Sequence, residues 1–413
     1  MQKSAVRLKA KSCPDFAPCD GAVVNLRRFI PFFDPSVDTW ALEARLLRWL
    51  TFLWLVLGLI VLFSASYAVA DTDFGDGLYY FERQLLWVLV GLVGFGILVH
   101  SPSRYVLGVA DWFTLLFLGL ILLTLLPGMG TTVNGATRWL SLGPLPILQP
   151  SELIKPFLVL QGARIFGQWD RLSTATRYTW LGLFAVLIGS ILLQPNLSTA
   201  ALCGMVLWLL ALASGLPYTA IFGTAIAGFL VAIISISARP YQRDRITAFL
   251  DPWHDPAGNG YQLIQSLLAI GSGGILGTGF GMSHQKLFYL PIQFTDFIFA
   301  VFAEEFGLIG CLLFLVLLAA YATLGYRVSL KARTAVHQLA AIGITTLLVG
   351  QSLLNIGVAT GALPTTGLPL PFFSYGGSSL ISSLLSAGLL IRIARESNEA
   401  EVLPLRVPQS TQG

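Results

Sequence analysis

Long apolar stretches recur along most of the chain, separated by short polar segments. A helix needs about 20 apolar residues to cross a hydrocarbon core of roughly 30 Å. Stretches of about that length predict ten transmembrane helices: 49–69, 84–99, 107–126, 151–167, 178–194, 197–214, 218–237, 296–324, 338–358 and 377–394. We therefore expect an all-α, polytopic membrane protein. A membrane domain at 49–394 would lie between an N-terminal tail at 1–48 and a C-terminal tail at 395–413.

Lys and Arg residues orient the predicted helices. The N-terminal tail is basic and carries Arg7, Lys9, Lys11, Arg27, Arg28, Arg45 and Arg48. The segment between the first two stretches is acidic and carries Asp71, Asp73, Asp76 and Glu82 against Arg83 alone. Because cytoplasmic segments are enriched in Lys and Arg, we expect both termini in the cytoplasm. No small-residue cleavage site follows the first stretch, which predicts a retained anchor rather than a signal peptide.

Composition agrees with this architecture and excludes several other classes. Apolar residues make up 55% of the chain and charged residues only 11%. The net charge of +4 is explained by the membrane topology, so no nucleic-acid partner is expected. The four histidines are dispersed, the four cysteines have no standard zinc spacing, and no nucleotide-binding motif is present. No resident metal site is predicted.

Three external segments contain too many polar, proline and glycine residues to be simple connections: 127–150, 238–295 and 359–376. The third contains prolines and glycines that prevent a continuous helix, yet its side chains are largely apolar. Unpaired backbone is costly in lipid, so this segment should pack into the protein or line a cavity. Within the second segment, 261–270 predicts a short interfacial helix. The glycines of 271–281 then predict a tight re-entrant turn or an amide nest for phosphate.

Asp296 is the first candidate for chemistry, because it lies at the external mouth of the long apolar stretch 296–324. Thr295 is predicted to cap this helix, and a helix dipole favours a carboxylate at its N-terminus. A structural acid and a catalytic acid are both consistent with the position. Glu304 and Glu305 lie deeper in the same stretch, where a carboxylate must be paired or protonated.

Basic side chains near the external face form the second group of candidates. Glu152 and Lys155 are one helical turn apart, which predicts an ion pair that could also border a polar cavity. The other external cations are Arg138, Arg239, Arg243, Arg245 and Lys286. Such residues are normally scarce in external segments. Their presence indicates either an anionic ligand or anchoring to lipid headgroups.

Several segments resemble the SEDS family, typified by FtsW, RodA and SpoVE. They are NGATRWLSLGP, QPSELIKP, YQRDRITAFLDPWHDPAGNGYQLIQSLLAIGSGGILGTG, QKLFYLP, TDFIFAVFAEEFGLIG and LPTTGLPLPFFSYGGSS. The resemblance extends over about residues 45 to 395, and DPW at 251–253 and QK at 285–286 resemble FtsW more than RodA. It implies a ten-span peptidoglycan glycosyltransferase that polymerises lipid II in the bacterial plasma membrane, at the division septum. The implied partners are a class B penicillin-binding protein and other division proteins.

The resemblance also implies roles for individual residues. The essential acid of the TDF motif corresponds to Asp296, and the PSE-x-x-K motif to Glu152 and Lys155. The external arginines of the family correspond to Arg138, Arg243 and Arg245. The chain departs from the family pattern at three positions: Asn196 in QPN for QPD, and Ile292 and Phe294 in PIQFTDF for PE-x-HTDF.

The chemistry of a lipid pyrophosphate donor suits these residues. Its leaving group needs charge neutralisation more than protonation, so a single carboxylate base is sufficient. We expect Asp296 to deprotonate the 4-hydroxyl of the acceptor sugar. Arg138, Arg243, Lys286 or a divalent cation, Mg²⁺ or Mn²⁺, would stabilise the departing pyrophosphate.

Three alternatives are kept. The first is a lipid II flippase with Lys155, Glu304 and Glu305 along its path, which would need polar residues through both leaflets. The second is a scaffold that recruits division proteins through the N-terminal tail. The third is a polymerase of the elongation type. Because charge in the loops is concentrated on one face, the sequence favours the polymerase.

Overall fold

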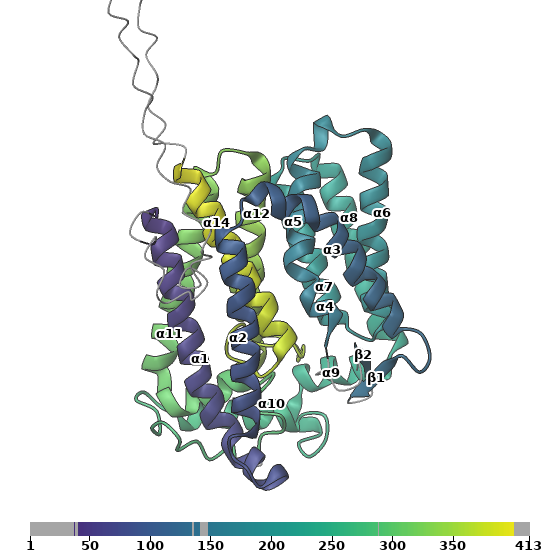
Figure 1. The fold of residues 1–413 in the computed structure, drawn as a ribbon. Coiled ribbons are helices and arrows are strands. Elements are labelled where there is room, and N and C mark those ends of the chain that lie inside the picture. The colour runs from purple at the N-terminus through teal and green to yellow at the C-terminus, as the bar shows by residue number, and fades with distance from the viewer. Residues whose placement is uncertain (1–36, 38–39, 134–135, 141–147, 288, 400–413) are drawn as a thin grey trace, which may run out of the picture.

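The computed structural model describes residue 37 and residues 40–133, 136–140, 148–287 and 289–399 (Figure 1). The helices of the first half are α1 (Leu42–Phe74), α2 (Tyr79–His100), α3 (Ser103–Thr124), α4 (Pro150–Leu153), α5 (Lys155–Gly167), α6 (Thr174–Leu193) and α7 (Leu197–Ala213). Those of the second half are α8 (Tyr218–Ala238), α9 (Pro240–Leu250), α10 (Tyr261–Ser272), α11 (Ile298–Lys331), α12 (Ala335–Thr345), α13 (Gln351–Ala359) and α14 (Gly377–Glu399). A π-helical turn, Thr346–Gly350, joins α12 to α13.

The helical membrane fold is confirmed, but the number of ten spans is not. Eight helices among the described residues are long and apolar enough to cross a membrane, with α12 and α13 counted as one. α7 is apolar but has only 17 residues. The predicted span 151–167 is divided at Ile154 into α4 and α5. Pro156 explains the division, because it has no N–H to donate to the turn before it.

The predicted tails differ from the structure at their edges. α1 begins at Leu42 and α14 extends to Glu399, so helix continues into both segments that were assigned to tails. Apart from residues 37, 40 and 41, the rest of both tails lies outside the described residues. The start of α1 and the end of α14 lie on the same side of the bundle, at the top of Figure 1. This agrees with an even number of crossings.

The external segments form small structured elements at the opposite side of the bundle. Segment 127–150 contains an antiparallel hairpin, β1 (Gly130–Val133) and β2 (Ala136–Leu140), which the all-α prediction did not include. Threonine, valine and tryptophan favour strands, which explains the hairpin. Segment 238–295 contains α9 and α10, and α10 confirms the short helix predicted at 261–270.

The core extends through α1, α2, α5, α7, α11, α12 and α14, and aromatic rings fill the part between α1 and α11. The Trp54 ring meets Phe314, Tyr321 and Phe372 edge to face, with centroids 5.1 to 6.0 Å apart. α8 is the opposite case, since Ile221 is its one buried residue and most of its other side chains are exposed. An exposed apolar helix of this kind is expected to contact lipid.

Candidate active site in an external cavity

A cavity of about 2260 Å³ opens between α2, α3, α5, α14 and the external segments. Asp296 lies at its external mouth, while Ser101 and Tyr105, at the turn between α2 and α3, line its other end. Between these ends the wall is mostly apolar and includes Leu86, Val90, Ile97, Val109, Phe113, Phe117 and Leu385. The cavity therefore combines a polar mouth with a long apolar groove along α2 and α3, and many side chains of that groove are exposed on the surface of the bundle.

Asp296 is half-buried at the mouth of this cavity. Its carboxylate makes no hydrogen bond or ion pair with the described residues. Burial raises the pKa of Asp296, and the positive charges of Arg245 and Arg138 oppose that rise. A raised pKa makes the carboxylate a stronger base, and the absence of a partner leaves its oxygens available to a substrate proton.

The backbone around Asp296 is held by two buried side chains. The Nδ2 of Asn355 donates to the carbonyl oxygens of Asp296 and Leu368, each at 2.8 Å. The hydroxyl of Ser374 donates to the carbonyl oxygen of Thr295 at 2.6 Å. Because Asn355 and Ser374 are themselves buried, they fix the direction in which the acid leaves the backbone.

The predicted cap of the eighth span by Thr295 is wrong. α11 begins at Ile298, and its N-cap position is Phe297, with no side-chain cap. The Thr295 hydroxyl instead donates to the carbonyl oxygen of Ile292 at 3.0 Å, within the turn before the helix. Asp296 therefore precedes the helix, and stabilisation by the helix dipole alone does not explain why an acid is placed there.

Two arginines bring positive charge to the mouth. Arg138, on β2, donates to the carbonyl oxygens of Gln194 and Pro195 at 3.1 and 2.5 Å. Arg245, on α9, donates to the carbonyl oxygen of Thr365 at 3.2 Å and to the Tyr241 hydroxyl at 2.5 Å. These acceptors are neutral, so they orient both guanidinium groups without cancelling their charge. Burial lowers the pKa of Arg138, which reflects the cost of a poorly solvated cation that a bound anion would relieve.

Gly367 lies beside both Asp296 and Arg245, which do not form an ion pair with each other. A Cβ placed on Gly367 would lie 3.4 Å from Asp296 Oδ2 and 3.8 Å from Arg245 Nη1. The φ of Gly367 is +72°, a left-handed conformation that glycine adopts readily. The backbone thus comes close to the acid and the arginine without filling the space between them.

The Glu152–Lys155 pair expected from the PSE-x-x-K segment is confirmed. The two charged atoms are 2.6 Å apart and both side chains are buried. Lys155 also donates to Gln351 Oε1 at 3.1 Å. Glu152 lines the cavity whereas Lys155 does not, so the lysine is a partner of the glutamate rather than a free cation for a substrate.

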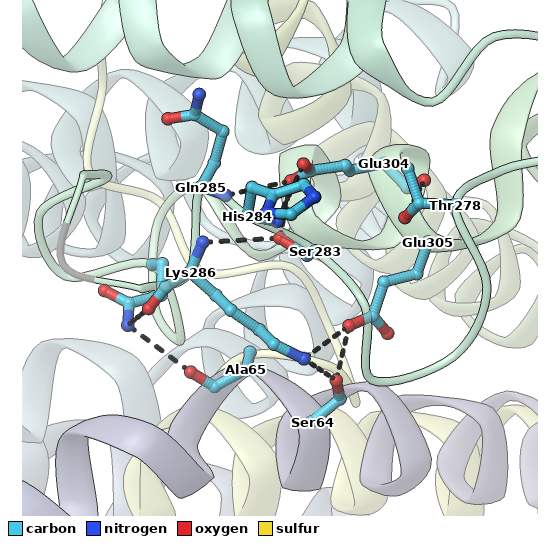
Figure 2. A network of polar contacts seen from close by, with 10 residues as sticks. Ser64, Ala65, Thr278, Ser283, His284, Gln285, Lys286, Glu304 and Glu305 are labelled. Atoms are coloured by element: carbon cyan, nitrogen blue, oxygen red, sulfur yellow. Dashed lines mark hydrogen bonds and ion pairs between the residues drawn. The ribbon is translucent and has the colours of Figure 1, made fainter.

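Two other predicted cations do not reach the cavity. Arg243 is exposed on α9 and does not line it, although its neighbours Tyr241, Gln242 and Arg245 do. Lys286 is buried elsewhere, with Nζ 2.9 Å from Glu305 Oε1 and 2.8 Å from Ser64 Oγ (Figure 2). The structure therefore gives neither of them the role at the pyrophosphate that the sequence suggested. Positive charge in a sequence does not reveal which way a side chain points.

Sequence reasoning missed two arginines as site residues. Arg83, on α2, lines the cavity, although in the sequence it is only a minority charge in an acidic segment. Arg239 also lines it, and its buried Nη1 has no hydrogen-bond partner among the described residues. The sequence marks Arg239 as external charge but does not place it at the site. Its position directly before Pro240, at the start of α9, was the available signal.

The glycine-rich segment 271–281 forms the predicted re-entrant turn against α11. Gly307 interrupts α11 with φ of 65° and ψ of −166°. On one side of the break, the N–H groups of Thr278 and Gly279 donate to the carbonyl oxygens of Glu304 and Glu305. On the other side, Leu308 and Ile309 donate to Gly274 and Ile275. The turn therefore replaces the hydrogen bonds that the broken helix lacks, and the N–H groups of Thr278 and Gly279 are not free for phosphate.

The carboxylates of Glu304 and Glu305 belong to the same buried network. Glu304 accepts from the Ser283 hydroxyl at 2.5 Å and from the backbone N–H groups of His284 and Gln285 (Figure 2). Glu305 pairs with Lys286 and Ser64. Neither glutamate lines the cavity. The ion pair of Glu305 agrees with the expectation that a carboxylate at this depth is paired or protonated, whereas Glu304 has hydrogen-bond donors but no ion pair among the described residues.

The three positions that depart from the family pattern all line the cavity. Asn196 caps α7 by accepting from the Thr199 N–H at 3.3 Å. Ile292 is exposed beside the mouth. The ring of Phe294 lies against Tyr80 and Tyr375, with centroids 4.7 and 5.8 Å away.

A resident metal is not supported by the donor set. Within the described ranges, no three His, Cys, Asp or Glu side chains gather where they could hold an ion. A divalent cation that enters with a substrate would therefore depend mainly on phosphate oxygens and water, as Mg²⁺ commonly does.

Fold and site together define a class: a polytopic helical membrane protein in which an unpaired carboxylate and several arginines face a cavity that continues into the bilayer region. The family model of FtsW, RodA and SpoVE, described as "Cell cycle protein", matches residues 44–399. The chain belongs to this family.

Individual relatives agree with the family assignment. The "Probable peptidoglycan glycosyltransferase FtsW" of Synechocystis sp. is 60% identical over 92% of this chain and 97% of its own. Two solved structures share the fold. One, described as "Structural coordination of polymerization and crosslinking by a peptidoglycan synthase complex", has a TM-score of 0.67 at 31% identity, covering 85% of this chain and 97% of that one. The other, rod shape determining protein RodA of Thermus thermophilus, has a TM-score of 0.62 at 28% identity, covering 85% and 96%.

Proposed function

We propose that Asp296 is the general base of glycan polymerisation in this chain, which is a peptidoglycan glycosyltransferase of cell division. The observation that carries the proposal is the unpaired Asp296 carboxylate beside Arg138 and Arg245, at the mouth of a cavity with a long apolar interior. A lipid-linked sugar has the same distribution of polar and apolar parts. Its sugar and pyrophosphate are polar, and its polyprenyl chain is apolar.

The reaction is a single displacement at the anomeric carbon of the donor. Asp296 removes the proton from the 4-hydroxyl of the acceptor sugar, and the oxygen attacks the donor C1. The C1–O bond to the pyrophosphate breaks, and the polyprenyl pyrophosphate leaves with the bonding electron pair. The configuration at C1 is inverted, and the carboxylic acid formed on Asp296 returns its proton to water.

Arg138 and Arg245 stabilise the charge that develops on the pyrophosphate. They reach the mouth from β2 and α9, and neutral acceptors hold both in place before the substrate arrives. Fixed donors of this kind stabilise a transition state without reorganisation. Arg239, with its unpartnered Nη1, adds a third positive charge to the same wall.

The polyprenyl chain lies along the apolar wall between α2 and α3. Phe113 and Phe117 of α3, stacked with Phe157 of α5, form part of that wall. An apolar groove at this depth explains why a reaction between polar sugars takes place in a membrane bundle.

A class B penicillin-binding protein is the proposed partner in the bacterial plasma membrane, with both termini cytoplasmic and enrichment at the septum. Support for the partner comes from the structurally similar peptidoglycan synthase complex, which is described as coordinating polymerization with crosslinking. The shared side of the first and last helices and the basic N-terminal tail support the orientation.

A flippase is less well supported. Lys155, Glu304 and Glu305, which would mark its path, do not line the cavity. The deep wall is apolar, whereas a transported pyrophosphate would need polar contacts through both leaflets.

Purified full-length protein, reconstituted with labelled lipid II, tests the proposal. Asp296→Asn should abolish polymer formation while the protein remains folded. Asp244→Asn, an acid of α9 that does not line the cavity, should polymerise normally. Polymer from Asp296→Asn at the wild-type rate would refute the base assignment.

A further inference from the structure

We propose that Tyr80, Phe294 and Tyr375 form an aromatic platform that binds a sugar ring of the lipid-linked substrate. This rests on the proposed function and adds a saccharide subsite to it. The three side chains come from α2, from the segment before α11 and from the segment before α14.

The rings of the platform lie close together in the cavity wall. Their centroids are 4.7 Å apart for Tyr80 and Phe294, 5.1 Å for Tyr80 and Tyr375, and 5.8 Å for Phe294 and Tyr375. All three line the cavity and all three are half-buried. Each ring therefore packs against its neighbours and still presents some surface to a ligand.

Backbone hydrogen bonds hold the platform in place. The N–H of Tyr375 donates to the carbonyl oxygen of Phe294 at 2.8 Å. Gln84, fully buried one turn after Tyr80, donates to the carbonyl oxygen of Ser374 and accepts from the N–H of Gly376, each at 3.3 Å. The three segments are thus fixed to one another on both sides of Tyr375. A surface fixed in advance loses less freedom on binding.

The platform is next to the proposed base. Phe294 precedes Asp296 by two residues, and Ser374, adjacent to Tyr375, holds the intervening carbonyl oxygen of Thr295. The hydrogen bonds of Gln84 and Ser374 therefore position both the rings and the acid. A saccharide on the platform would lie beside Asp296, where an acceptor hydroxyl has to be.

The chemistry of the platform suits a sugar. An aromatic face carries partial negative charge and attracts the polarised C–H groups on one face of a pyranose ring. The two tyrosine hydroxyls and Arg83, which also lines the cavity, can hydrogen-bond with sugar hydroxyls. The phosphate contacts come from other elements, β2 and α9.

An interfacial aromatic belt that contacts lipid is the alternative explanation. Phe74 and Tyr79, stacked at 3.8 Å at the same end of the bundle, fit that description because neither lines the cavity. Phe74 itself contacts Tyr80, so the matched control is Tyr67, which is exposed on α1, packs against Phe63 and does not line the cavity.

Binding of two probes to the full-length protein separates these explanations: lipid II, and undecaprenyl pyrophosphate, which has the same lipid and phosphates but no sugar. Phe294→Leu and Tyr375→Leu should raise the Kd for lipid II about tenfold and leave that for undecaprenyl pyrophosphate unchanged. Phe294→Tyr should bind both like wild type, and so should Tyr67→Leu.

Equal weakening of both probes, or no weakening of either, would overturn the platform. Polymerisation by Asp296→Asn in a parallel assay reports on the proposed function instead. Normal polymer from that variant, together with selective loss of lipid II binding in the leucine variants, would contradict the base and support the platform. An inactive Asp296→Asn with unchanged binding in the leucine variants would contradict the platform alone.

Discussion

Lys286 and Glu305 form a buried ion pair, with Nζ and Oε1 2.9 Å apart, that joins the segment before Asp296 to the broken part of α11. The lysine Nζ also donates to Ser64 of α1. Gln293, three residues before Asp296, donates to the carbonyl oxygen of Lys286 at 3.0 Å. The pair thus holds the segment before Asp296 in place, and neither of its residues lines the cavity.

Removal of Lys286 should therefore reduce stability rather than affect pyrophosphate binding directly. Lys286→Met leaves Glu305 buried without its cation, and we expect a loss of about 3 kcal/mol in the free energy of unfolding. Thermal unfolding of the purified protein measures this. The double variant Lys286→Met, Glu305→Leu should recover much of the stability and the polymerase activity. Persistent inactivity of a stable double variant would return Lys286 to a role at the substrate.

The pH dependence of polymerisation should reflect the ionisation of Asp296. Burial raises its pKa, so the active, deprotonated form is lost at a higher pH than for an ordinary aspartate. The rate should fall as pH drops through that pKa. Arg245→Gln removes a charge that lowers the pKa, so the acidic limb should shift to higher pH. A limb that stays in place would contradict the coupling between Arg245 and Asp296.

Asn355 should act as a positioning residue. Asn355→Ala removes the hydrogen bond to the carbonyl oxygen of Asp296, and we expect kcat to fall about tenfold with a smaller change in KM. Ser352→Ala, on the same helix, removes only a hydroxyl that donates to the carbonyl oxygen of Leu348 and should be close to wild type. Equal loss in kcat for both variants would indicate general damage to α13.

Gly367→Ala tests the space between Asp296 and Arg245. The new methyl group would lie 3.4 Å from Asp296 Oδ2, and the alanine backbone would have to adopt an unfavourable φ. Activity should therefore fall at least tenfold. Gly361→Ala is a matched control, because its φ is +70° and its Cβ would meet only leucine side chains at 3.5 Å or more. Similar initial rates for the two variants would show that backbone strain alone explains the effect.

Local sequence patterns predicted the parts of the molecule that depend on local physics. Apolar stretches predicted the membrane helices, and the spacing of Glu152 and Lys155 predicted their ion pair. The position of Asp296 after a polar loop pointed to the mouth of the cavity, and the TDF resemblance marked the same residue.

What could not be predicted depends on contacts between distant segments. Lys286 and Arg245 look equivalent in the sequence, yet Glu305 neutralises the first, and among the described residues the hydrogen-bond acceptors of the second are neutral. The Thr295 cap failed because the turn before α11 uses that hydroxyl. The break at Gly307 is stable only because Gly274 and Ile275, more than 30 residues earlier, supply acceptors. No local pattern contains that information.

The interruption of α11 has a mechanical consequence. A continuous helix would act as a rigid rod, so that any tilt of its membrane-embedded part would carry the acid with it. Here the glycine-rich turn is hydrogen-bonded to α11 on both sides of Gly307, so the two parts of the interrupted helix stay linked through that turn. A tilt of the membrane-embedded part therefore reaches Asp296 only together with the glycine-rich turn, and the base moves with both.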